Sequence, residues 1–270
     1  MTERTEVLQP EPAVALARLL GVPPPNLDTD GLPLLWHWVY LLDRPLQADL
    51  GPDGHPVRGV VPAPPAPGRR RMAAGGRVTR TGPLVVGRAA TRRTEIVSTT
   101  DKTGRSGPLT FVVVRHTLSQ DDGVKVIEEQ DIVYRDAAPA ATPAGSATAA
   151  TPVPLEADER AFPVDPTVLF RFSALTYNAH RIHYDRDYAH DVEGYPGLVV
   201  HGPLQALVMA EAVRATGATA TAIDYRVVAP LLHHQGLVVR SPATGSSRRV
   251  SVRDHGGRVT ANGLVETPAG

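Results

Sequence analysis

The chain of 270 residues balances 28 lysines and arginines against 28 aspartates and glutamates, and it contains no cysteine. The lack of a basic block excludes electrostatic binding to nucleic acid. The lack of thiols excludes disulfide frameworks, thiolate catalysis and cysteine-based zinc sites. The N-terminus is polar and no run of about 18 apolar residues occurs, so we expect a cytoplasmic protein that does not enter a membrane.

In the first half, an apolar stretch at 33–42 predicts a helix. This stretch carries Trp36, Trp38 and Tyr40, which we expect in the core, with the lining of an acyl cavity as the alternative. Segments rich in Val, Ile and Thr then predict strands near 76–81, 84–98, 109–118 and 124–134. The GRSGP sequence at 104–108 predicts a tight turn.

A change of composition divides the chain. Residues 137–154 are only Ala, Pro, Thr, Gly, Ser and Val. Such a segment has no large apolar side chains whose burial would offset the entropy lost on ordering. We therefore expect a flexible linker at 137–154 between an N-terminal domain, 1–136, and a C-terminal domain, 155–270.

The second half repeats the order of elements expected in the first. A helix at 203–215 precedes strands near 221–228, 235–241, 247–253 and 258–265. A helix followed by antiparallel strands is typical of a sheet that wraps around one helix. The expected class is therefore α+β, with two helix-wrapped antiparallel sheets.

The segment 172–204, FSALTYNAHRIHYDRDYAHDVEGYPGLVVHGPL, concentrates the residues that can carry chemistry. It holds Asn178, His180 and His183, and it leads through a glycine-rich turn into His201-Gly202-Pro203 at the start of the helix. A helix N-terminus offers free N–H groups and partial positive charge to an oxyanion. An imidazole nearby can transfer a proton near neutral pH.

This segment resembles the hydratase motif of MaoC-like, hot-dog-fold enoyl-thioester hydratases and dehydratases. That family's pattern is an Asp, Asn-Pro two residues on, a His five residues after the Asp, and His-Gly at the start of the central helix. The corresponding positions here hold Asn178, His180-Arg181, His183 and His201-Gly202. The string fits best the branch of (R)-3-hydroxyacyl-thioester dehydratases and mesaconyl-C4-CoA hydratases. LPLLWHWVYLL (32–42), LGPDGHP (50–56), GRSGPL (104–109) and EEQDIVYR (128–135) extend the likeness over residues 10–265.

The resemblance implies a double hot-dog fold and hydration or dehydration of an enoyl or (R)-3-hydroxyacyl thioester, without cofactor or metal. The substrate would be an acyl-CoA or acyl-carrier thioester, and a homodimer is a further expectation. Because the first half lacks a second copy of the motif, it would shape the acyl pocket and leave one active site in the C-terminal half.

Within that reaction we expect three catalytic groups. His183 would exchange a proton with the substrate or water. Gly202 would present its N–H to the thioester oxygen as an enolate forms. Asn178 departs from the family's carboxylate, and an amide has no proton to exchange, so it would position a water or brace the turn.

A further set is expected to bind substrate: Arg181, Tyr177, His201 and Arg105. Arg181 could meet a substrate carboxylate or a CoA phosphate, although a structural ion pair is the alternative. His180, His183 and Asp185 have a spacing that a metal could use, but the resemblance implies none, and Asp185 and Asp187 are expected to brace a turn.

Three other functions fit the same pattern. The chain could be a dehydratase that tailors products of fatty-acid or secondary metabolism. It could be an acyl-CoA thioesterase, since one fold hosts several chemistries. From a different class, it could be an acyl-thioester-binding partner subunit without turnover, an alternative that Asn178 keeps open.

Overall fold

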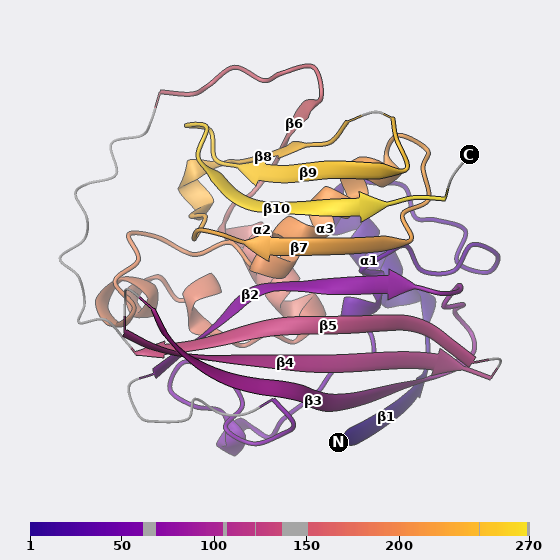
Figure 1. Ribbon diagram of the computed structural model, residues 1–270, viewed down its shortest axis with the longest axis horizontal. Helices are drawn as coiled ribbons and strands as arrows, with labels where there is room; N and C mark the ends of the chain where they lie inside the picture. The colour runs from indigo at the N-terminus through magenta and orange to yellow at the C-terminus, as the bar shows by residue number, and fades with distance from the viewer. Residues whose placement is uncertain (62–68, 105–106, 122, 137–150, 243, 269–270) are drawn as a thin grey trace.

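One antiparallel sheet of ten strands organises the computed structural model, which describes residues 1–61, 69–104, 107–121, 123–136, 151–242 and 244–268. The strand order is β1-β3-β4-β5-β2-β7-β10-β9-β8-β6 (Figure 1). The strands are β1 Thr2–Val7, β2 Arg69–Arg80, β3 Ala89–Gly104, β4 Gly107–Gln120, β5 Gly123–Asp136, β6 Glu159–Phe162, β7 Ala222–Val227, β8 Leu237–Arg240, β9 Ser247–Arg253 and β10 Val259–Glu266.

The two halves of the chain occupy the two halves of this sheet and meet at the β2–β7 pair. The register runs from Gly75 opposite Arg226 to Thr79 opposite Ala222. Gly75 has φ +157°, and a Cβ atom there would collide with the carbonyl oxygen of Tyr225. A glycine therefore lets the halves approach at this junction.

Three α-helices pack on one face of the sheet: α1 Pro10–Leu20, α2 Pro166–Thr176 and α3 Gly202–Arg214 (Figure 1). Each has proline in its first turn, where no N–H donor is needed. The Asp165 carboxylate accepts the Val168 N–H at 2.8 Å and so caps α2. Among the described residues, no helix is both long and apolar enough to cross a bilayer.

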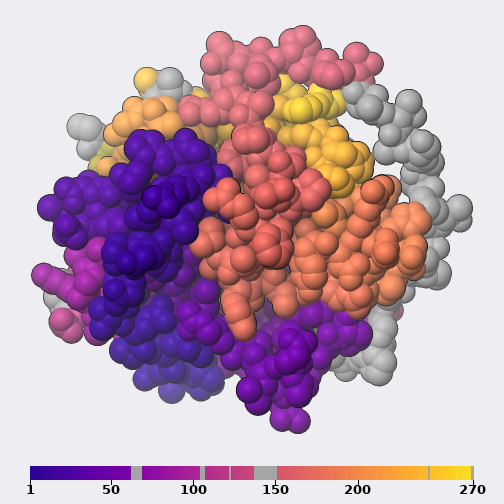
Figure 2. Space-filling model, turned by 180° about the vertical axis from the view of Figure 1, so that it is seen from behind, coloured from indigo at the N-terminus to yellow at the C-terminus, as the bar shows by residue number. Residues whose placement is uncertain are grey.

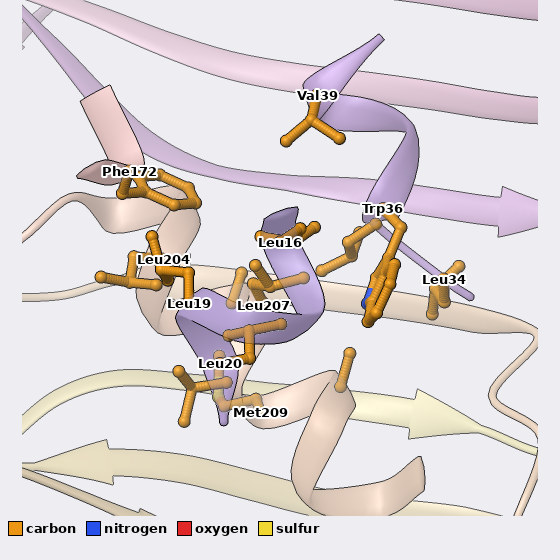
Figure 3. Packing of buried hydrophobic residues seen from close by; sticks show 14 of the residues in the cluster. Leu16, Leu19, Leu20, Leu34, Trp36, Val39, Phe172, Leu204, Leu207 and Met209 are labelled. Carbon is orange, nitrogen blue, oxygen red and sulfur yellow. The ribbon is translucent and has the colours of Figure 1, made fainter. Parts of the chain in front are cut away.

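Helix α3 is the centre of the core. Every residue from Leu204 to Val213 is buried, as expected for a helix that is covered on all sides. Leucines of α1 and Phe172 of α2 pack close to its Leu204 and Leu207 (Figure 3). This packing fixes the start of α3, where His201 and Gly202 lie.

The helix predicted at 33–42 is wrong. The structure has a 3₁₀ helix over Trp36–Val39, and Leu35 and Leu41 on either side of it have positive φ. Trp36 and Tyr40 are buried in the core as expected, and Trp38 and Tyr40 also line a cavity. The helix of this half is α1, which the sequence did not predict.

The other predicted elements are present with shifted ends. Strand β2 begins at Arg69 and β3 at Ala89, whereas strands were expected from 76 and 84. Helix α3 and strands β4, β5, β7, β8, β9 and β10 lie where they were expected. Strands β1 and β6 and helix α2 were not predicted.

The linker expected at 137–154 falls mostly outside the described residues. Its last residues are described, and there the Val153 N–H donates to the His255 carbonyl at 2.7 Å. The division at this segment therefore stays a prediction.

Candidate active site

The end of α2 places the chemically active segment. Tyr177 ends the helix with φ +51°, and the Asn178 N–H donates to the Ser173 carbonyl at 2.8 Å. The Asn178 side-chain oxygen then accepts the His180 N–H at 3.0 Å. This turn leads into the short 3₁₀ helix Arg181–His183. The Asn178 amide thus braces the turn with its oxygen and keeps its NH₂ group free for other contacts.

Four imidazoles follow one another through the site, and we call them the imidazole row. The His201 and His183 rings stack at 3.6 Å, the His183 and His180 centroids are 5.3 Å apart, and the His180 and His55 centroids are 4.0 Å apart. His201 directly precedes Gly202, the first residue of α3. The row therefore starts at the N-terminus of α3 and ends on a residue from the other half of the chain.

His183 and His201 are each held by a short hydrogen bond. His183 Nδ1 lies 2.7 Å from the Val199 carbonyl, so Nδ1 carries the proton and Nε2 is the atom available for chemistry. His201 Nε2 lies 2.9 Å from Ser173 Oγ, and its Nδ1 is buried without a partner among the described residues.

Burial keeps these imidazoles neutral. It lowers the pKa of His183 to about 4, although the hydrogen bond to Val199 raises it, and the charge of His55 lowers it further. Burial also lowers the pKa of His180 and of His201 far below the usual value. Neutral His183 is in the form that accepts a proton.

A loop from the first half, residues 51–56, closes over this segment. The Asp53 carbonyl accepts the Arg181 N–H at 2.9 Å, and the Pro52 carbonyl accepts Arg181 Nη1 at 3.0 Å. Gly54 has φ +85°, and a Cβ atom there would collide with the carbonyl oxygen of Ala179. Seen from the helical face, purple residues of the first half lie against the salmon and orange residues that carry the motif (Figure 2).

A cavity of about 1010 Å³ opens beside this contact. It is large enough for an acyl chain and part of its carrier. Tyr177, Asn178 and Pro203 line it from the second half, and His55 and Arg71 line it from the first. The cavity wall therefore combines the motif with residues more than a hundred positions earlier in the chain.

Arg71, on β2, is the unusual cation of this wall. The structure shows no carboxylate within ion-pair distance of Arg71 among the residues it describes. Burial lowers its pKa, while Tyr134 and the charge of Asp53 raise it. The charge of Arg71 in turn lowers the pKa of His55 and Asp53, and Arg71 and His55 line the same cavity.

Other cavity residues form a buried polar cluster that fixes the 3₁₀ helix Trp36–Val39 to β5. Glu128 accepts hydrogen bonds from His37 Nε2 at 2.9 Å, Trp38 Nε1 at 2.8 Å and Gln130 Nε2 at 2.7 Å. Burial raises the pKa of Glu128, but the hydrogen bond and charge of His37 outweigh burial and lower it to about 2. A satisfied carboxylate of this kind makes the wall rigid.

The predicted site residues are thus distributed in three places. Tyr177 and Asn178 lie on the cavity wall, whereas His183, His201 and Gly202 are not among the residues that line it; His183 stacks on His201, which precedes the start of α3. Arg181 is bound to Asp185 at 2.7 Å and lies over the Tyr188 ring at 4.1 Å, so its guanidinium ties the loop down. Arg105 falls outside the described residues.

Sequence reasoning did not single out Asp53, His55 or Arg71. The Asp-Gly-His spacing in the 50–56 segment, on a turn rich in glycine and proline, was the signal that could have marked the first two. Arg71 carried no signal, because it precedes the strand expected at 76–81, where an arginine resembles any solvated residue.

One cluster has the composition of a metal site. Among the described residues, donor atoms of Asp53, His55 and His180 lie within 4.8 Å of one another. Asp185 of the expected set is instead engaged by Arg181 and by the Tyr188 N–H at 3.0 Å. The neighbouring Arg71 opposes a divalent cation at the cluster, because like charges repel strongly when partly buried.

Known structures share this fold. HtdX from Mycobacterium tuberculosis superposes with a TM-score of 0.68 at 16% identity, over 98% of this chain and 99% of its own. A MaoC-like dehydratase from Phytophthora capsici superposes with a TM-score of 0.70 at 15% identity, over 100% and 96%. The molecule therefore has the double hot-dog fold of the MaoC-like dehydratase class.

Residues 35–233 match the model of the family described as hydroxyacyl-thioester dehydratase type 2. The chain is also 48% identical over 226 residues, 81% of this chain and 78% of the relative, to mesaconyl-C(4)-CoA hydratase of Chloroflexus aurantiacus. The chain belongs to the hydroxyacyl-thioester dehydratase type 2 family and is a hydro-lyase that acts on acyl thioesters. The predicted fold, family and reaction class are confirmed.

Proposed function

We propose that the protein reversibly hydrates an enoyl-CoA whose acyl group carries a free carboxylate, of the kind named by its relative, mesaconyl-C4-CoA. Arg71 carries this proposal, because it is a cavity-lining guanidinium without an ion-pair partner among the described residues. In mesaconyl-C4-CoA one carboxyl group forms the thioester and the other stays free, on the carbon that receives the hydroxyl group. Guanidinium groups bind carboxylates through paired hydrogen bonds.

The order of groups in the site matches the order of atoms in such a substrate. The Gly202 N–H at the start of α3 would meet the thioester oxygen. His183, which stacks on His201 beside it, would then face C2. His55, at the far end of the row, and Arg71, on the cavity wall with it, would face C3 and its carboxylate. The thioester oxygen, C2, C3 and the carboxylate would thus each lie beside a protein group suited to it.

In the dehydration direction, neutral His183 takes the proton from C2 and the Gly202 N–H stabilises the enolate. Asn178 supports this arrangement by bracing the turn and by offering its NH₂ group to the cavity. Tyr177 forms part of the pocket wall. His201 packs against His183 at one end of the imidazole row. Hydration follows the same steps in reverse.

The two halves of the chain then have different roles in the reaction. The C-terminal half, 155–270, supplies the motif and the start of α3. The N-terminal half, 1–136, shapes the acyl end of the cavity and supplies Arg71. One active site per chain follows from this division.

A substrate panel tests the proposal. We expect the purified protein to hydrate mesaconyl-C4-CoA with a higher kcat/KM than crotonyl-CoA, which has the same enoyl thioester without the carboxylate. Product analysis by liquid chromatography should show the 3-hydroxyacyl-CoA and no free CoA. Preference for crotonyl-CoA would contradict the substrate class. Free CoA would indicate a thioesterase, and binding without turnover would indicate a partner subunit.

A further inference from the structure

The proposed reaction needs a second proton-transfer group, and the motif does not supply it. At the position where the family has a carboxylate, Asn178 has no exchangeable proton, and its oxygen is engaged by the His180 N–H at 3.0 Å. His183 can exchange the proton at C2. A further group must give a proton to the hydroxyl that leaves C3, or take one from the water that attacks it.

Asp53 and His55 have the geometry of such a group. His55 Nδ1 lies 2.9 Å from Asp53 Oδ2, and the His55 backbone N–H donates to Asp53 Oδ1, also at 2.9 Å. Two bonds to one carboxylate fix the ring and place the proton on Nδ1. No described residue is hydrogen-bonded to Nε2, so this atom is available to a substrate.

The Asp53–His55 pair is also held in a fixed position beside the motif and the cavity. His55 lines the cavity and lies 4.0 Å, centroid to centroid, from His180 in the imidazole row. Gly54, between the two members of the pair, packs so tightly on Ala179 that a Cβ atom would not fit. The loop is thereby held at one distance from the motif, as acid–base chemistry requires.

We propose that Asp53 and His55 form the second proton-transfer pair of the active site, with His55 as the catalytic residue at C3 and Asp53 as its positioning residue. This inference rests on the proposed function. In dehydration, His183 takes the C2 proton and the C2–H electron pair becomes the C2=C3 bond. The C3–O bond breaks, and the His55 imidazolium gives its Nε2 proton to the leaving oxygen, which departs as water.

The charges of this step balance. His183 gains one proton and His55 loses one, and exchange with solvent through the cavity restores both between turnovers. Hydration is the reverse: neutral His55 takes the proton of the attacking water, and the His183 imidazolium returns a proton to C2. Asp53 stabilises the charged form of His55 in both directions.

The substrate itself would favour the charged form of His55. Burial lowers the pKa of His55 and the charge of Arg71 lowers it further, while Asp53 raises it. A substrate carboxylate on Arg71 removes the opposing charge, so His55 takes up its proton when the correct substrate is bound. His180 and His183, the other titratable groups beside it, stay neutral.

Removal of the imidazole is the first test. We expect His55→Ala to lose about 10²–10⁴-fold in kcat for dehydration of the 3-hydroxyacyl-CoA, the range for loss of a general acid. Added imidazole should restore part of the rate, because the deletion leaves room on the cavity wall. The matched control is His190→Gln, which breaks a similar His–Asp bond, 2.7 Å to Asp191, on the surface. A His55→Ala variant as active as this control would overturn the inference.

The second test separates chemistry from structure. Asp53→Asn removes the charge that raises the pKa of His55, so the alkaline limb of the kcat profile for dehydration should move to lower pH. A merely structural Asp53 would lower the rate without moving the limb, and that result would overturn the pair. His55→Gln, which keeps the size of the side chain, should be as slow as His55→Ala if folding is intact by circular dichroism.

Two further outcomes are distinguishable. Dialysis against a chelator should leave activity unchanged; loss of activity that Zn²⁺ restores would replace the pair with a metal site on Asp53, His55 and His180. Failure of the wild type to turn over any enoyl-CoA would remove the proposed function. A wild type that turns over while His55→Ala matches it would remove this inference alone.

Discussion

His183→Ala should lose about 10²–10⁴-fold in kcat, the usual span when a general acid or base is removed. The ring stacks on His201 beside the start of α3 with Nδ1 fixed by Val199, and burial lowers its pKa to about 4, so it is neutral and ready to take the C2 proton. No other described imidazole combines this position with a free Nε2. Steady-state kinetics on one substrate in both directions would measure the loss.

Exchange of the C2 hydrogen with D₂O provides a second readout for the same variant. His183→Ala should lose this exchange along with turnover, because His183 is the group that meets C2. The surface variant His190→Gln should keep both. An unchanged rate of exchange in His183→Ala would assign the C2 proton to a different residue.

Arg71→Gln should reverse the substrate preference. Loss of the guanidinium leaves the substrate carboxylate unpaired in a partly buried site, so kcat/KM for mesaconyl-C4-CoA should fall about 10²–10³-fold. The value for crotonyl-CoA, which has no carboxylate, should change far less. The comparison of kcat/KM for the two substrates measures the effect of Arg71 on the acyl group alone.

Arg58 offers the matched control for this substitution. It is another arginine on the cavity wall, but its side chain is 82% exposed and is paired with Asp49 at 3.4 Å. Arg58→Gln should leave the preference unchanged. An equal loss on both substrates in Arg71→Gln would show that the residue supports the fold or CoA binding and does not select the acyl group.

Local patterns predicted much of the sheet because its strands alternate. Strand β4 has buried residues at every second position, which the run of Val and Thr anticipates. The segment at 33–42 was mistaken for a helix because its apolar residues were counted without the turn geometry. Leu35 and Leu41 adopt positive φ, which β-carbon sterics disfavour and only tertiary packing imposes.

Site contacts between residues close together in the sequence could be predicted, and those between residues far apart in the sequence could not. The turn from Asn178 to His183 and the helix start at Gly202 lie within one motif, so their proximity followed from the sequence. Asp53 meets Arg181 across 128 positions of the chain, and Arg71 reaches the cavity from a strand whose start was not predicted. Contacts of that kind depend on the assembled sheet and carry no local periodicity.

A crystal structure of the His183→Ala variant with mesaconyl-C4-CoA bound would show directly whether one substrate spans both halves of the chain. We expect the free carboxylate on the Arg71 guanidinium, the thioester oxygen at the Gly202 N–H, and C3 within reach of His55 Nε2. A complex in which the acyl group points away from Arg71, with its carboxylate in solvent, would show that Arg71 does not bind the substrate.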